Sequence, residues 1–409
     1  MLNIRGLKTR HVLLRTVATV STALALGVVV TTSAAGAAAA RAQSSGTLVG
    51  SLRTDLSRHL ASRGPVDHIS AVSLTVTYPD GQPGVAASVG TTRYVGGTPV
   101  SSNALWQIGS NTKAFTAVML LQLEAEGTLS IHDTLGRWLP QYPQWRDVTL
   151  EQLLDMTSGI ADYTSQEAFA DTLGSRPDTV FSESQLLGFV TGLPLAGHGY
   201  AYSNTNYILA QMVIERATHD TYADQLTKRI IKPLGLRDTC LAPYTCPAAA
   251  ATRMPAGYFA ESGAPAFPDA QVPPLALTWA QGAGGIVSSL QDMTTWDRAL
   301  YTGRELPAAQ QRELETLVST TTGQPIEATT PTDPQGYGLG VVEESLGIGT
   351  VWAYEGETLG YRVLHLYFPR TGLILAIAVN SSADADTLPG LAETVYQTLQ
   401  DNGAAGASR

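Results

Sequence analysis

Cysteine and charged side chains are scarce in this sequence, and their scarcity excludes several kinds of protein. The 409 residues include two cysteines, and 15% of them are charged. None of the seven histidines forms a His-x-His or His-Glu-x-x-His pattern, and no second Cys or His pair has zinc-type spacing, so we expect no metal site. A net charge of −10 argues against nucleic acid and anionic membrane surfaces, which bind basic patches. The sequence also lacks the Gly-x-Ser-x-Gly elbow of α/β-hydrolases.

Residues 1–42 have the composition of a signal peptide. An apolar run at 17–30 follows a basic segment, and Ala40-Arg41-Ala42 provides a cleavage site, so the mature chain is expected to begin near Gln43. The alternative is an uncleaved anchor, because the uncharged stretch 16–40 is long enough to span a bilayer. Either way, we expect the body of the protein to be exported. In an oxidising compartment the closely spaced Cys240 and Cys246 are expected to pair as a disulfide.

Strand patterns occur at both ends of the chain, and helix patterns lie between them. A hairpin is predicted over 71–89 and a meander over 337–343, 351–354, 361–368 and 373–380, followed by a helix over 388–400. Helices are predicted at 150–156, 206–217, 222–231 and 290–301. The expected fold is α+β: an antiparallel sheet built from both chain ends and flanked by helices, with an all-helical lobe from the middle. We expect one domain over 43–402, beginning with a short linker at 43–47, and a disordered tail over 403–409.

The most informative motif is Ser110-x-x-Lys113, which precedes an apolar helical run from Ala114 to Leu123. On a helix, residues three apart lie on one face, about 4.5 Å apart along the axis. A serine hydroxyl is a weak nucleophile until a base takes its proton, and lysine can be that base when burial lowers its pKa. The spacing alone is also compatible with an exposed helix turn and a solvated lysine.

A second motif, Tyr202-Ser203-Asn204, stands just before a predicted helix. Near Ser110 and Lys113, Tyr202 could act as a phenolate-like base or a proton relay, and Asn204 could donate to a substrate carbonyl. The alternative is a helix cap formed by Ser203 or Asn204, with Tyr202 packed in the core.

These motifs stand in the order of a known family. Ser110-x-x-Lys113, Tyr202-x-Asn204, the segment Gly282-Ala-Gly-Gly285-Ile-Val-Ser-Ser before a Trp296-containing helix, and a Gly-rich strand near Gly356 follow one another along the chain. The sequence resembles the serine β-lactamase and penicillin-binding-protein superfamily, in particular its class C β-lactamase and D-alanyl-D-alanine carboxypeptidase-like branch, from about Val72 to the last helix. The resemblance implies the β-lactamase/transpeptidase-like fold.

The resemblance also implies roles for these residues. Ser110 would be the acylated nucleophile, Lys113 its base, and Tyr202 the group that passes the proton to the leaving group. Asn204 would hold the substrate amide. The third family motif, a Lys or His followed by Thr or Ser and Gly, matches Tyr354-Glu355-Gly356, and the amide of the next residue, Glu357, would complete the oxyanion hole.

The third motif departs from the family because Tyr354 replaces the cation that orients a substrate carboxylate. Glu355 and Glu357 add negative charge nearby. Arg362 would substitute for the cation if its side chain reaches inward, whereas strand alternation favours a solvent-facing position.

The resemblance therefore implies an exported serine hydrolase that forms an acyl-enzyme at Ser110 and needs no cofactor. The first expectation is a D-alanyl-D-alanine carboxypeptidase-like enzyme acting on peptidoglycan stem peptides or β-lactams, with no partner protein. An esterase or D-aminopeptidase of the same fold is the alternative that Tyr354 and the glutamates favour. A catalytically silent binding protein is the alternative of another class.

Overall fold

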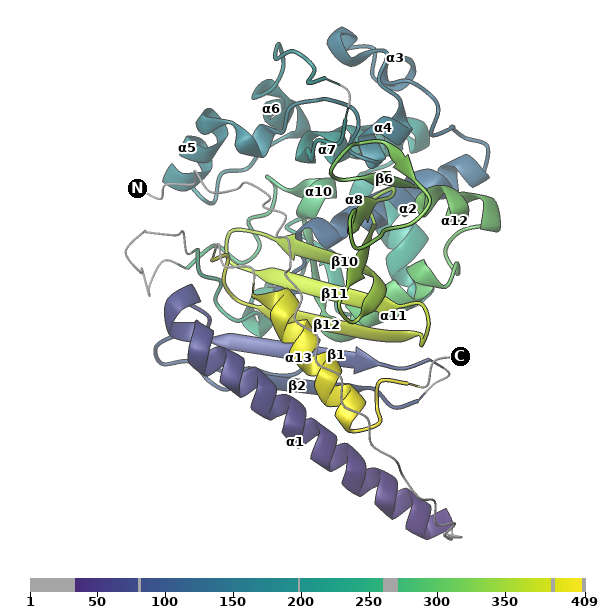
Figure 1. Ribbon diagram of the computed structural model, residues 1–409. Coiled ribbons are helices and arrows are strands. Elements are labelled where there is room, and N and C mark those ends of the chain that lie inside the picture. The colour runs from purple at the N-terminus through teal and green to yellow at the C-terminus, as the bar shows by residue number, and fades with distance from the viewer. Residues whose placement is uncertain (1–33, 80–81, 198, 260–270, 384–386, 407–409) are drawn as a thin grey trace.

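A nine-stranded antiparallel sheet joins the two ends of the chain in the computed structural model (Figure 1). The structure describes residues 34–79, 82–197, 199–259, 271–383 and 387–406. Across the sheet the strands are β2 (Val85–Gly90), β1 (Ala71–Thr77), β12 (Leu373–Val379), β11 (Arg362–Phe368), β10 (Gly349–Glu357), β9 (Val342–Leu346), β8 (Gln335–Tyr337), β6 (Leu317–Ser319) and β7 (Pro325–Ile326). The first strand β1 pairs with the last strand β12, from Val72↔Val379 to Thr77↔Ile374. This pairing confirms the prediction of a sheet built from both chain ends.

Two helices from opposite ends of the chain, α1 (Ala34–Asp67) and α13 (Leu388–Asp401), cover one face of this sheet (Figure 1). Leu52 and Leu56 of α1 are fully buried, and with Leu48 they form a row at four-residue spacing that packs on the sheet. The linker predicted at 43–47 is therefore wrong, because this segment is part of α1. Residues 34–42 of the predicted signal peptide also belong to α1, and residues 1–33 lie outside the described part of the chain.

No helix within the described ranges has both the length and the apolar character needed to cross a bilayer. At the other end of the chain, the prediction of a disordered tail from Gly403 is wrong for residues 403–406. The Ala404 amide donates to Leu399 O at 2.7 Å, and Ala405 is buried against the α1/α13 face of the sheet. Residues 407–409 lie outside the described part.

The middle of the chain forms the predicted helical lobe on the other face of the sheet (Figure 1). It comprises α2 (Thr112–Ala125), α3 (Leu135–Trp138), α4 (Leu150–Leu154), α5 (Glu167–Ser175), α6 (Glu183–Gly188), α7 (Asn204–Thr218), α8 (Tyr222–Leu226), α9 (Lys232–Leu234), α10 (Gln281–Gly284), α11 (Leu290–Tyr301) and α12 (Ala308–Leu314). A small antiparallel sheet, in the order β3 (Leu105–Gln107), β5 (Ile286–Ser289) and β4 (Thr239–Leu241), also lies in this part of the chain. The all-helical description of the middle was therefore incomplete.

Local capping and turn chemistry decide where several elements begin and end. Thr149 and Gln152 form a reciprocal capping box at the start of α4, and the Ser289 hydroxyl accepts from the Asp292 amide at the start of α11. The strand predicted over 337–343 is instead two strands, separated at 338–341, where Gly340 has φ 78°. A Cβ atom on Gly340 would lie 2.9 Å from Lys113 O, so the chain bends here to pass close to α2.

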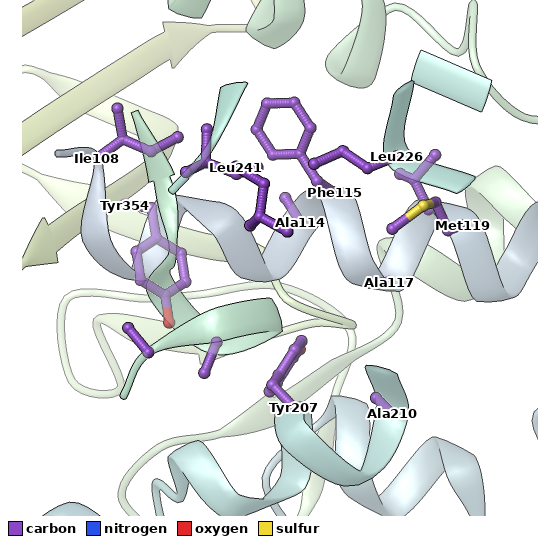
Figure 2. Packing of buried hydrophobic residues seen from close by; sticks show 14 of the residues in the cluster. Ile108, Ala114, Phe115, Ala117, Met119, Tyr207, Ala210, Leu226, Leu241 and Tyr354 are labelled. Carbon is purple, nitrogen blue, oxygen red and sulfur yellow. The ribbon is translucent and has the colours of Figure 1, made fainter. Parts of the chain in front are cut away.

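Helix α2 is buried on nearly every side. Phe115 stacks on Trp296 of α11 with ring centroids 3.9 Å apart, and Figure 2 shows Phe115 and Met119 beside Leu226 and Leu241 of other elements. A helix that is apolar around its whole circumference belongs in a core. Any polar side chain on the first turn of α2 is therefore removed from water.

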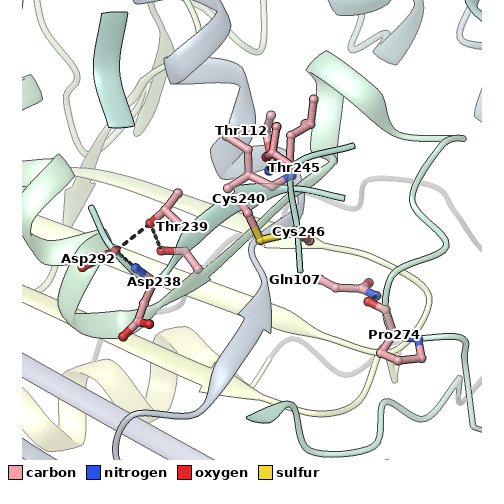
Figure 3. The surroundings of a disulfide bond; sticks show 12 residues. Gln107, Thr112, Asp238, Thr239, Cys240, Thr245, Cys246, Pro274 and Asp292 are labelled. Carbon is pink, nitrogen blue, oxygen red and sulfur yellow. Dashed lines mark hydrogen bonds between the residues drawn. A yellow bond between two sulfur atoms is a disulfide. The ribbon is translucent and has the colours of Figure 1, made fainter. Parts of the chain in front are cut away.

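The disulfide Cys240–Cys246 closes a loop that follows β4 (Figure 3). In the same strand, Thr239 Oγ1 donates to the Asp292 carboxylate at 2.9 Å, and the Asp238 amide donates to the same oxygen at 2.7 Å. Since β4 pairs with β5, and β5 runs directly into α11, these contacts hold the small sheet against the start of α11.

Candidate active site

Ser110 lies on the tight turn that connects β3 to α2. The turn residues Gly109–Asn111 form one 3₁₀ turn, and Gly109 has φ 52°. A Cβ atom on Gly109 would come within 2.6 Å of both Glu357 N and Glu357 O, so glycine is required for this approach as well as for the left-handed backbone. The turn therefore places the Ser110 backbone in close contact with the end of β10.

Lys113 is fully buried one helical turn after Ser110. Its Nζ atom donates to Ser110 Oγ at 3.0 Å, Asn204 Oδ1 at 2.7 Å and Ala283 O at 2.8 Å. Three acceptors match the three protons of an ammonium group. After loss of one proton, the two shorter bonds can remain while the nitrogen lone pair faces Ser110.

Burial lowers the pKa of Lys113 to about 7, and the negative charge of Asp162 opposes this shift without cancelling it. A substantial fraction of the side chain is therefore a neutral amine at neutral pH. At 3.0 Å from Ser110 Oγ, a neutral amine is placed to accept the serine proton.

Tyr202 provides the second contact to the nucleophile. Its hydroxyl lies 2.6 Å from Ser110 Oγ, and its ring centroid lies 4.8 Å from Lys113 Nζ. Burial raises the pKa of Tyr202, while hydrogen bonds with Ser110 and Tyr354 act in the opposite direction. Because the hydroxyl stays protonated at neutral pH, the geometry favours a proton relay over a phenolate base.

Asn204 begins α7 and orients Lys113. Its Oδ1 atom accepts from Lys113, its Nδ2 atom donates to Thr164 Oγ1 at 3.1 Å, and its backbone amide donates to Asp162 Oδ1 at 3.1 Å. Sequence reasoning missed Asp162 and Thr164. The Asp162 side chain accepts from the Thr164 amide, which is a recognisable local cap, but nothing in the sequence linked that cap to Asn204.

Strand β10 brings the third motif to Ser110. A Cβ atom on Gly356 would lie 2.0 Å from Ile108 O and 2.9 Å from Ser110 N, so β10 runs directly against the Ser110 turn. The amides of Ser110 and Glu357 are thereby carried by two backbone segments in contact. Two such donors can stabilise the negative charge that develops on a carbonyl oxygen during acylation.

Tyr354 points into a cluster of tyrosines beside Ser110 and Tyr202. It is 8% exposed, and its hydroxyl lies 3.0 Å from that of Tyr337, whose ring packs on Tyr200 with centroids 5.4 Å apart. Burial raises the pKa of Tyr354 well above its ordinary value, so the hydroxyl is neutral. The position at which the sequence departs from the family motif thus carries no positive charge.

Arg362 does not replace that charge, and it does not face solvent either. The side chain is 3% exposed, donates from Nε to Ser381 O at 3.3 Å, and has its NH1 atom 3.8 Å from Glu355 Oε1. Since neighbouring Leu364 packs with α1 and α13, strand alternation puts Arg362 and Glu355 on the sheet face opposite Ser110. Glu357 is exposed, and its negative charge helps to raise the pKa of Tyr202.

The structure therefore brings together Ser110, Lys113, Tyr202 and Asn204, with the backbone of Gly356 and Glu357 against them. Tyr354 lies beside these residues, and its hydroxyl bonds to those of Tyr202 and Tyr337. Cys240 lies apart from them in β4, and Cys246 in the loop that follows this strand. Within the described ranges, no three His, Cys, Asp or Glu side chains are close enough to hold a metal ion.

The chain is similar in sequence and in fold to known proteins. The chain is 27% identical over 281 residues to penicillin-binding protein 4* of Bacillus subtilis, and the match covers 66% of this chain and 59% of that protein. A D-stereospecific amidohydrolase from Streptomyces superimposes with a TM-score of 0.71 and 28% identity over 86% of this chain and 98% of that one. A D-amino acid amidase from Ochrobactrum anthropi, solved with L-phenylalanine amide, superimposes with a TM-score of 0.72 and 25% identity. This match covers 87% of this chain and 99% of that one.

A family model described as Beta-lactamase matches residues 60–399, from the last turns of α1 into α13. The matched range includes the whole nine-stranded sheet, the helical lobe and every residue around Ser110. On this evidence the chain belongs to the β-lactamase family and has the fold shared by serine β-lactamases and penicillin-binding proteins.

Proposed function

We propose that this protein is a serine hydrolase that forms an acyl-enzyme at Ser110. Ser110 Oγ bonds to the substrate carbonyl carbon as its proton passes to Lys113, and the amides of Ser110 and Glu357 hold the resulting oxyanion. When the intermediate collapses, the leaving group takes a proton from Tyr202, which Lys113 resupplies. Water then releases the acyl group by the reverse sequence of proton transfers. The distances of 3.0 Å and 2.6 Å from Ser110 Oγ to Lys113 and Tyr202 support these roles.

The favoured substrates are D-amino-acid amides and short D-peptides with a free amino group. The observation that carries this choice is buried Tyr354, which stands where a cation would orient a substrate carboxylate. The exposed Glu357 and the nearby Asp162 make the surroundings of Tyr202 acidic, which suits a substrate ammonium group. The likeness to a D-stereospecific amidohydrolase and a D-amino acid amidase supports the same class.

The second candidate is the D-alanyl-D-alanine carboxypeptidase-like activity expected from the motifs. Its support is the resemblance to penicillin-binding protein 4*, which covers 59% of that protein. Peptidoglycan stem peptides and β-lactams both present a carboxylate, and no side-chain cation is provided by Tyr354. An esterase would need neither a carboxylate nor an ammonium site.

One substrate panel separates these candidates. The protein lacking residues 1–42 is incubated separately with D-phenylalanine amide, a D-Ala-D-Ala peptide, a fluorescent penicillin and a p-nitrophenyl ester. Turnover is followed together with intact mass and peptide mapping of the adduct. Ser110→Ala is the test variant, and Ser184→Ala, an exposed serine on α6, is the matched control.

We expect the wild type and Ser184→Ala to hydrolyse the amide and to carry the acyl group on Ser110, and Ser110→Ala to do neither. Preferred turnover of the D-Ala-D-Ala peptide would favour the carboxypeptidase assignment. Turnover of the ester alone would favour the esterase assignment. Absence of both turnover and adduct on the wild type would leave the silent binding protein. Equal activity of Ser110→Ala would overturn the nucleophile assignment.

We further propose that the protein is exported and cleaved after Ala42. The support is the basic and apolar composition of residues 1–42 with the Ala40-Arg41-Ala42 site. The mass of the protein recovered from the medium or envelope of an expressing bacterium tests this. A chain that begins at Gln43 is expected, and a membrane-bound chain of full length would support the uncleaved anchor instead.

A further inference from the structure

A buried polar network adjoins the Ser110 turn. It contains Asn111 from the turn, His365 from β11, and Tyr301 and Asp297 from α11. Asn111 is 2% exposed, His365 3% and Asp297 0%. None of these side chains has a role in the acylation chemistry described above.

The hydrogen bonds of Asn111 determine which atoms of the network donate and which accept. Its Nδ2 atom donates to Ile108 O at 2.8 Å and to Val363 O at 2.9 Å, which uses both of its protons. Its Oδ1 atom can therefore only accept, and its partner at 2.7 Å is Nδ1 of His365. His365 must carry a proton on Nδ1.

The other ring nitrogen of His365 lies 2.8 Å from the Tyr301 hydroxyl. Burial lowers the pKa of His365 to about 3, so the ring is neutral and Nε2 accepts from Tyr301. Asp297 is not the partner of Nδ1, because its nearest oxygen is 3.8 Å away, beyond hydrogen-bond distance. The Nδ1 proton of His365 is thus donated to Asn111 Oδ1.

The position of Asn111 affects both donors of the oxyanion hole. Its bond to Ile108 O closes the turn around Ser110, and its bond to Val363 O ties that turn to β11. Val363 pairs directly with Gly356 on β10, one residue before the Glu357 amide. A Cβ atom on Gly356 would lie 2.6 Å from Asn111 Nδ2, so Asn111 is packed between the two backbone segments.

We propose that His365 is a positioning residue for the oxyanion hole: by orienting Asn111, it sets the separation between the Ser110 and Glu357 amides. This inference rests on the acylation of Ser110 proposed above. His365 touches neither the nucleophile nor its base in this role. Loss of its bond to Asn111 should therefore lower the rate of the chemical step while substrate binding is largely retained.

Two variants of similar size separate the two hydrogen bonds of His365. In His365→Asn the amide nitrogen takes the place of Nδ1 and keeps the bond to Asn111, whereas in His365→Gln it takes the place of Nε2 and keeps only the contact with Tyr301. We expect His365→Asn to retain kcat within about fivefold, and His365→Gln to lose about 10- to 100-fold in kcat with KM changed less than about threefold. Both variants should lose similar thermal stability.

Acylation of the wild type is measured first by intact mass. A wild type that is never acylated overturns the proposed function and this inference with it. An acylated wild type for which His365→Asn and His365→Gln have equal kcat overturns the positioning role alone, because His365 would then be merely structural.

If either variant fails to fold, Tyr301→Phe and Asn111→Ser decide the same question. Tyr301→Phe removes a hydrogen bond that does not reach Asn111, so its kcat should stay within about threefold, while Asn111→Ser should lose about 10- to 100-fold. Equal kcat values for these two variants contradict the proposal.

Discussion

The Nζ atom of Lys113 lies 3.0 Å from Ser110 Oγ although Lys113 is fully buried. An ammonium group without solvent contact is costly unless it is paired, and among the described residues the opposing charge that raises its pKa is that of Asp162, which acts through space. The fold therefore uses burial in the apolar surroundings of α2 to make a base from a residue that is normally protonated. This relationship leads directly to a pH prediction.

Acylation should increase with pH through a single ionisation near 7. Below that pH Lys113 is protonated and cannot accept the Ser110 proton, and above it the neutral amine can, because burial lowers its pKa to about 7. The pH dependence of kcat/KM for the free enzyme, with the substrate that it turns over best, measures this value. A profile without a change near neutrality, or one with its midpoint near 10, would contradict the assignment of Lys113 as the base.

Replacement of Tyr202 by Phe should slow acylation by about 10²- to 10⁴-fold, the range of general acid–base catalysis. The variant loses the hydroxyl 2.6 Å from Ser110 Oγ but keeps the ring over Lys113. Tyr222→Phe is the matched control, since it removes another buried hydroxyl, bonded to Thr116 at 2.7 Å. The acylation rate of each variant is measured from burst kinetics, and we expect Tyr202→Phe to be slower than Tyr222→Phe. Equal acylation rates for the two variants would exclude Tyr202 from the proton transfer.

Tyr354→His should improve turnover of substrates that carry a carboxylate. When the introduced imidazole is protonated, it restores positive charge where Tyr354 now pairs with Tyr337, and about 1.4 kcal/mol of added attraction corresponds to a tenfold gain. The measured quantity is the ratio of kcat/KM for a D-Ala-D-Ala peptide to that for D-phenylalanine amide. Tyr354→Phe, which removes the hydroxyl without adding charge, should leave the ratio unchanged. If Tyr354→His changes this ratio no more than Tyr354→Phe does, the missing cation does not determine substrate choice.

Asp297→Asn should stabilise the protein increasingly as pH rises. Both carboxylate oxygens are buried without a hydrogen-bond partner in the described part of the chain, and burial raises the pKa of Asp297 well above 3.8, with Arg298 opposing. Between the unfolded-state pKa and the higher folded-state pKa, the folded protein holds a proton that the unfolded chain releases, so the free energy of unfolding falls by about 1.4 kcal/mol per pH unit in that range. Asparagine does not titrate and avoids this loss.

Denaturant unfolding at about pH 5 and about pH 7 measures the effect, with the exposed Asp147→Asn as control. The difference between Asp297→Asn and wild type should be larger at the higher pH. A difference that is the same at both pH values would mean that Asp297 is already ionised in the folded protein.

Much of the architecture could be predicted from local patterns. Capping residues such as Thr149 and Ser289 identify helix starts because their side chains satisfy backbone amides within the next turn. Helix α1 was not predicted even though Leu48, Leu52 and Leu56 recur at helical spacing. Similarly, Gly340 inside a strand pattern could have indicated the break between β8 and β9.

By itself, the sequence determined the residue types of the candidate site, the order of the motifs and the placement of strands at both chain ends, because these depend on residue identity and short-range periodicity. Only the tertiary structure decided that Arg362 faces away from Ser110, that Asp162 supports Asn204, and that His365 holds Asn111. A period of two says that strand residues alternate between faces but not which face meets the site. Contacts across 42 or 254 residues depend on how the sheet and the helical lobe pack, which local patterns do not encode.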